Sequence, residues 1–127
     1  MPLPECPKSP NCVSTMTTSQ RHAIEPYVYE GTKKEAYRLI QRILEADANV
    51  TILKADENYL EAEFKTKVLR FKDDVIFYFG DEGRVHFLSK SRLGYSDLGK
   101  NRQRMEILRK QFHNAINNET QLKPNLN

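Results

Sequence analysis

The chain has 127 residues and a formal net charge of +3, with 39% hydrophobic and 29% charged residues. This length is typical of a single domain, and it is enough to bury a core that needs no metal ion or disulfide. The composition excludes a chain that is disordered throughout. No apolar run approaches the roughly 18 residues of a membrane-spanning helix.

Residues 1–30 are rich in proline, serine and threonine and show little periodicity. They predict an extended leader that docks on the domain, with a short extended piece at residues 25–29. The first five residues lack the basic and apolar regions of a signal peptide, so a cytoplasmic location is the default expectation. We expect a single domain at residues 31–118 and a polar tail at residues 119–127.

The first predicted helix begins at a capping box in residues 32–35 (TKKE). In this motif the hydroxyl of Thr32 caps one free backbone N–H group, and Glu35 reaches back to another. The helix is expected to end near residues 47–49. Its buried face is formed by five apolar residues at helical spacing: Ala36, Leu39, Ile40, Ile43 and Leu44.

Four strands are predicted next, followed by a second helix. The strands are Val50–Leu53, Tyr59–Thr66, Val75–Phe79 and Arg84–Arg92, and a glycine-containing turn joins the last two. The side-chain alternation changes phase between Lys65 and Asp74, which predicts a bulge or bend there. The second helix is expected to run from about residue 98 to Asn117, with Ser96 or Asp97 as its cap.

The order helix, four strands, helix predicts an α+β domain. We expect an antiparallel sheet of four or five strands with both helices packed on one face. That face is expected to consist of Leu60, Ala62, Phe64, Val75, Phe77, Phe79, Val85 and Phe87. The opposite face is mixed in polarity, so we expect the leader, a partner or a ligand to cover it.

Both cysteines, Cys6 and Cys12, lie in the leader. A metal site is disfavoured because there is no second cysteine pair and the three histidines (His22, His86 and His113) are far apart in sequence. A short-loop disulfide could form and would stabilise the fold by about 2 kcal/mol, but only in an oxidising compartment. Reduced thiols are the default expectation, and no metal or cofactor is predicted.

Basic residues gather near the C-terminus. Residues 90–110 contain seven basic residues against Asp97 and Glu106. Such a stretch could attract phosphate or an acidic partner. A solvated helix face is the favoured interpretation, because nucleic-acid-binding domains usually carry a larger overall positive charge.

Four segments together are distinctive: residues 6–14 (CPKSPNCVS), 59–63 (YLEAE), 70–75 (RFKDDV) and 91–102 (SRLGYSDLGKNR). In this order they resemble the domain-of-unknown-function family 1499 (DUF 1499), over roughly residues 6–116. The resemblance implies a small bacterial, cyanobacterial or plastid protein, and family members are often exported or membrane-anchored. Leu88 departs from the family pattern, which commonly has arginine there. The resemblance implies no reaction.

The segment 91–102 is the strongest candidate for a site, at a junction of strand, loop and helix. Its candidate ligand-binding residues are Arg92, Tyr95, Ser96, Asp97, Asn101 and Arg102. Arg92 and Arg102 suit a carboxylate or phosphate, although Asp97 would repel an anion. The alternative is architectural: Asp97 caps the helix, Asn101 bonds loop backbone, and Arg92 pairs with one of two aspartates in the preceding strand.

Those aspartates, Asp73 and Asp74, are also candidates, but adjacent strand residues point to opposite faces and cannot act as a pair. The leader adds Asn11, Cys12 and Ser14, which are expected to dock it on the domain. Cys12 could be a nucleophile only beside a histidine, and nothing in the sequence fixes one there. His86 is expected to be a partly exposed sheet histidine rather than a proton carrier.

These observations favour a non-catalytic module that binds a small anionic ligand or a protein partner. One alternative is a small hydrolase or thiol-dependent enzyme that uses Cys12 or Asp97. Another is a weak nucleic-acid or anion binder that uses the basic C-terminal helix, although nucleic acid is disfavoured by the modest net charge.

Overall fold

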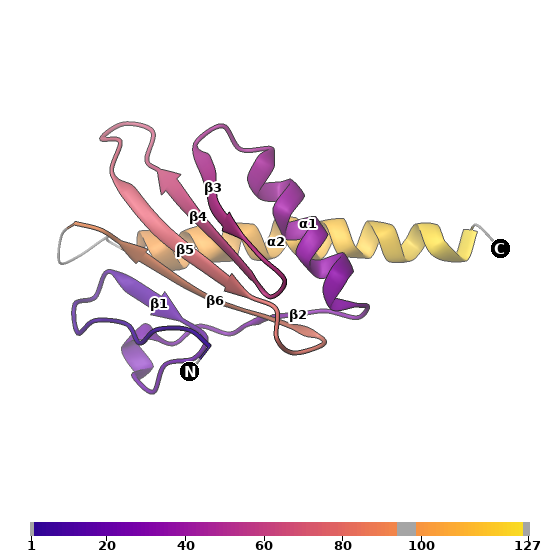
Figure 1. Ribbon diagram of the computed structural model, residues 1–127, viewed down its shortest axis with the longest axis horizontal. Coiled ribbons are helices and arrows are strands. Elements are labelled where there is room, and N and C mark those ends of the chain that lie inside the picture. Colours follow the sequence, from indigo (N-terminus) through magenta and orange to yellow (C-terminus); the bar gives the residue numbers. More distant parts are fainter. Residues whose placement is uncertain (1, 94–98, 126–127) are drawn as a thin grey trace.

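A computed structural model describes residues 2–93 and 99–125 as an α+β fold in which helices cover one face of an antiparallel sheet (Figure 1). The strands are β1 (Cys12–Ser14), β2 (Tyr27–Val28), β3 (Val50–Ala55), β4 (Tyr59–Lys65), β5 (Lys72–Tyr78) and β6 (Arg84–Ser91). The helices are the 3-10 helix η1 (Gln20–His22), α1 (Lys33–Glu45) and α2 (Lys100–Asn125). In these residues no helix is long and apolar enough to cross a membrane.

The sheet has six strands, not the four or five that the sequence predicts. The strand order is β1-β6-β5-β4-β3, and β2 also pairs with β6. All pairs are antiparallel. The two additional strands come from the leader, and they contain only three and two residues. Strands this short are too brief to produce a recognisable alternation, so only their pairing with β6 reveals them.

The core lies between the sheet and the two helices, where Figure 1 shows α2 crossing behind the strands. All eight residues of the predicted apolar sheet face are buried, which confirms that part of the prediction. The helices contribute Leu39, Ile40 and Leu44 from α1, and Met105 and Phe112 from α2. Burial of these side chains is the main favourable contribution to folding.

Helix α1 begins where its cap predicts. The Thr32 hydroxyl oxygen accepts a hydrogen bond from the backbone N–H of Glu35 at 3.1 Å. This bond satisfies one of the N–H groups that have no partner within a helix. The helix ends at Glu45, slightly before the expected residues 47–49.

The change of phase after Lys65 is a chain reversal. Lys65 and Lys72 face each other across the β4–β5 hairpin, so the alternation restarts in a new strand. A register shift does occur in the sheet, but it lies in β3, between Ile52 and Lys54. Helix α2 also differs from expectation, because it continues to Asn125 rather than ending near Asn117.

The leader covers part of the second sheet face. Leu3 and Cys12 pack with Leu88 in a second, smaller apolar cluster. The Tyr59 hydroxyl donates a hydrogen bond to the backbone oxygen of Pro2 at 2.7 Å. Leu88 is buried where it packs against the leader.

Candidate functional site

A polar network is buried between the sheet and the start of α2. It consists of Asp73 on β5, Ser89 on β6, and Asn101 and Arg104 on α2. The Arg104 guanidinium forms an ion pair with Asp73 and donates to Asn101 Oδ1 at 2.9 Å. Ser89 Oγ donates to the same Oδ1 atom at 2.6 Å. Because a buried charge requires a partner, this arrangement stabilises the junction between sheet and helix.

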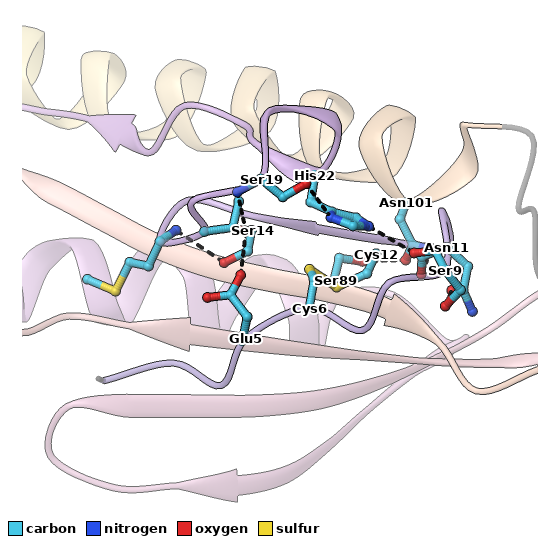
Figure 2. Close-up of a disulfide and its surroundings, with 12 residues drawn as sticks. Glu5, Cys6, Ser9, Asn11, Cys12, Ser14, Ser19, His22, Ser89 and Asn101 are labelled. Atoms are coloured by element: carbon cyan, nitrogen blue, oxygen red, sulfur yellow. Dashed lines mark hydrogen bonds between the residues drawn. A yellow bond between two sulfur atoms is a disulfide. The ribbon is translucent and has the colours of Figure 1, made fainter.

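Asn101 extends this network to the leader (Figure 2). Its Nδ2 donates to Ser91 Oγ at 2.9 Å and to the backbone oxygen of Asn11 at 3.3 Å. Asn11 Nδ2 in turn donates to the backbone oxygen of Ser91 at 3.0 Å. Asn101 has no exposed surface and Asn11 is 4% exposed. These two candidate residues therefore join leader, β6 and α2, and neither presents its side chain to solvent.

Asp74 and Arg92 lie on the opposite face of the sheet. Arg92 donates from Nη2 to Asp74 Oδ1 at 2.7 Å and to Glu63 Oε2 at 2.8 Å. The hydrogen bonds that Arg92 donates to Asp74 and Glu63 raise the pKa of Arg92 further above its ordinary value. Arg92 thus forms ion pairs with two surface carboxylates. Of the two aspartates that the sequence offers as its partner, it pairs with Asp74.

The structure joins Cys6 and Cys12 in a disulfide (Figure 2), rather than the two thiols that are the default expectation from the sequence. Cys12 is 1% exposed, and in this bonded form it offers no thiolate. The His22 ring lies in the same region but is engaged by Ser9 and Ser19. Ser14 Oγ accepts a hydrogen bond from the backbone N–H of Met16 at 3.1 Å.

Arg102 binds the backbone of the leader. Its guanidinium donates to the backbone oxygens of Ala23 at 2.8 Å and Arg21 at 3.3 Å. Arg109 acts similarly, donating to the backbone oxygens of Pro26 and Glu25. The remaining candidates, Tyr95, Ser96 and Asp97, lie outside the described residues.

His86 lies on β6 beside the leader. Its Nδ1 lies 3.0 Å from Thr15 Oγ1, and its Nε2 lies 3.5 Å from a carboxylate oxygen of Asp81. Burial lowers the pKa of His86 below its ordinary value, and the negative charge of Asp81 partly opposes that shift. His86 is 9% exposed, so it is more buried than the sequence suggests.

A basic pocket of about 390 Å³ lies where the α1–β3 loop, the β4–β5 loop and the start of α2 meet. Its lining includes four basic residues, Lys65, Lys67, Lys100 and Arg104, and one acidic residue, Asp47. Within the described part of the chain, Lys67 and Lys100 have no ion pair, whereas Arg104 has one with Asp73. Sequence reasoning missed this pocket, because Lys65 and Lys67 lie far along the chain from Lys100 and Arg104.

A second hollow, also about 390 Å³, lies beside the leader and is lined by Arg102, Glu106 and Arg109. Its two arginines already bond leader carbonyls, and Arg109 also bonds Glu106. The basic pocket therefore has more positive charge without an ion-pair partner than this second hollow has, within the described residues. No group of three or more histidine, cysteine, aspartate or glutamate side chains suited to a metal ion occurs in residues 2–93 and 99–119.

The structure thus defines a small α+β domain whose leader pairs with β6 at one side of its sheet. The family model described as "Protein of unknown function (DUF1499)" matches residues 2–112 of the chain. The chain therefore belongs to the DUF1499 family. No curated protein and no solved structure matches it significantly.

Proposed function

We propose that this protein is a non-catalytic module that binds a small anionic ligand in the basic pocket. The observation that carries the proposal is the convergence of Lys65, Lys67 and Lys100, none of them in an ion pair within the described residues, on one hollow with Asp47 as its acidic lining residue. Arg104 also lines this hollow, but its charge is balanced by Asp73. Clustered cations in a concave site favour phosphate or carboxylate groups. This moves the proposed site away from Arg92 and Asp74, whose charges neutralise each other.

The polar motif gives no support to a catalytic role. Asn11, Asp73, Asn101 and Arg104 bond one another, which is the pattern of an architectural network. The thiol-enzyme alternative requires a thiolate at Cys12, which is bonded to Cys6. The other nucleophile candidate, Asp97, is outside the described residues. Nucleic-acid binding has less support, because Arg102 and Arg109 are engaged by leader carbonyls.

The test is titration calorimetry with pyrophosphate as the probe. Lys67→Glu combined with Lys100→Glu should weaken binding at least about tenfold, because it replaces two attractive charges by repulsive ones. Lys34→Glu, at an exposed position of α1, makes the same kind of charge change away from the pocket and should leave the affinity nearly unchanged. Arg104 is left intact because it pairs with Asp73.

Added salt should weaken the binding, since the attraction is between charges. If pyrophosphate does not bind to the unaltered protein, or if the Lys67 and Lys100 variant binds it as well as the Lys34 variant does, the proposal is wrong. Turnover of a substrate that is lost in Asp97→Ala would instead support the hydrolase alternative.

A further inference from the structure

The loop between β4 and β5 exposes an unusual number of apolar side chains. Val68 is 88% exposed, Leu69 is 67% exposed and Phe71 is 47% exposed. Leu93, which follows β6, is 74% exposed. Scattered exposed apolar residues need no explanation, but three in one six-residue loop form a patch. We call residues 66–71 the apolar loop.

Hydrogen bonds hold the apolar loop in shape. The backbone N–H of Thr66 donates to the backbone oxygen of Phe71 at 2.8 Å, and the N–H of Phe71 donates to Thr66 Oγ1 at 2.8 Å. Arg70 has a φ of 56°, which a residue with a side chain rarely adopts. The loop is therefore closed at its base, and Val68 and Leu69 stand at its tip.

The surroundings of the apolar loop are basic. Lys65, Lys67, Arg70 and Lys72 lie in or beside it, and the segment from 65 to 72 contains no acidic residue. Val68 and Leu69 also line the basic pocket, beside Lys100. An apolar tip and a cationic pocket thus belong to one continuous surface at this end of the sheet, where β4 turns back into β5 (Figure 1).

We propose that this surface docks on a membrane rich in anionic phospholipid. This inference rests on the proposed function, and it names a lipid phosphate as the anion that the basic pocket receives. Val68 and Leu69 enter the boundary between headgroups and acyl chains, while Lys67, Arg70 and Lys100 meet the negative headgroups. Apolar side chains combined with cations are what such a boundary favours.

The size of the patch favours a membrane over a protein. A stable protein interface buries about 800 Å² on each partner, usually around a shape-complementary apolar centre. A six-residue loop is small compared with such an interface, and the positive charge around it complements a surface of negative charge. A fluid headgroup layer adapts to such a tip without a matching cavity.

The experiment is co-sedimentation of the whole protein with vesicles. One set contains phosphatidylcholine alone, and the other contains phosphatidylcholine and phosphatidylglycerol at about three to one, so that only the second set has net negative charge. We expect the protein to sediment with the second set only, and to be released by added salt. Equal binding to both sets, or to neither, would overturn the inference.

The apolar contribution is tested by Val68→Ser combined with Leu69→Ser. This variant should bind the anionic vesicles at least about tenfold more weakly, because the tip loses its apolar side chains. Ile107→Ser, which changes an apolar residue of α2 that is 53% exposed, is the matched control and should bind normally. Unchanged vesicle binding by the loop variant would contradict the inference. The inference would also be wrong if the protein self-associates and the loop variant loses self-association instead of vesicle binding.

Pyrophosphate titration separates this inference from the proposed function. The titration uses the unaltered protein rather than the loop variant, because Val68 and Leu69 also line the basic pocket. Pyrophosphate binding without vesicle binding refutes the membrane inference and leaves the anion-binding module standing. If the protein binds neither pyrophosphate nor the anionic vesicles, the proposed function and the membrane inference are both wrong.

Discussion

Asp73 and Asp74 are adjacent in the chain, yet they lie in opposite environments. Asp73 is 2% exposed and pairs with Arg104, whereas the Asp74 side chain is 35% exposed and pairs with Arg92. Breaking a buried ion pair leaves a charge without a partner or water, while an exposed pair is screened by solvent.

We therefore expect Asp73→Asn to lower the free energy of unfolding by about 3 kcal/mol. Asp74→Asn is the matched control, with the same chemical change one residue away, and should have only a small effect. Urea denaturation of the two variants measures the difference. Similar losses in both variants would contradict the assignment of Asp73 to a structural network.

His86 predicts a specific dependence of stability on pH. Its pKa is lowered in the folded protein, so the unfolded chain binds a proton more readily. The stabilisation is therefore complete above the ordinary histidine pKa of 6.5, and it declines as the pH falls through the range down to the folded pKa. Asp81→Asn removes a charge that raises this pKa, so it should lower the pKa further.

An NMR titration of the His86 ring measures its pKa in the unaltered protein and in the Asp81→Asn variant. Denaturation at several pH values should show a larger loss of stability below pH 6.5 in Asp81→Asn than in the unaltered protein. A rise in the His86 pKa after this substitution would show that Asp81 does not act on the ring as a negative charge.

At this scale the sequence predicts some contacts and misses others. The two-residue period of a strand places Asp73 and Asp74 on opposite faces, and the structure agrees. The structure also pairs Arg92 with Asp74, which is one of the two aspartates that the sequence offers as its partner. The partnership between Asp73 and Arg104 was not predicted, because it depends on how α2 is placed over the sheet.

The leader is held by side chains of α2 as well as by its backbone pairing with β6. Arg102, Arg109 and His113 of α2 all contact its backbone oxygens. Tyr27, in β2, donates from its hydroxyl to the backbone oxygen of Met105 at 2.6 Å. The basic stretch that suggested a solvated face or an anion site therefore serves in part to hold the leader.

The disulfide adds a covalent constraint to this element. Reduction with dithiothreitol should lower the free energy of unfolding by about 2 kcal/mol, the value expected for closing a short loop in the chain-entropy model. Hydrogen exchange should quicken in β1 while β4 and β5 stay protected, because Cys12 begins β1, whereas β4 and β5 are held by their own backbone pairing. Unchanged stability after complete reduction would contradict this prediction.

For the whole molecule, the fold class follows from two simple patterns. The helical spacing of apolar residues in 36–44 and the strand alternation in 60–64 identify which side chains form the core. Strand number does not follow, because β1 and β2 are too short to show a pattern and form only by pairing with β6. The basic pocket is also beyond sequence reasoning, since it is assembled from two separate loops and the start of a helix.

The pairing of β1 and β2 with β6 also affects how this protein behaves at high concentration. A sheet edge with unpaired backbone groups can recruit a strand from another molecule and begin aggregation. Here β1 pairs with residues 88–90 of β6 and β2 with residues 84–85, while Thr15 bonds both the N–H and the carbonyl of Phe87 between them. The other edge, β3, is interrupted by its register shift and carries Lys54. Both edges of the sheet thus discourage the addition of a foreign strand.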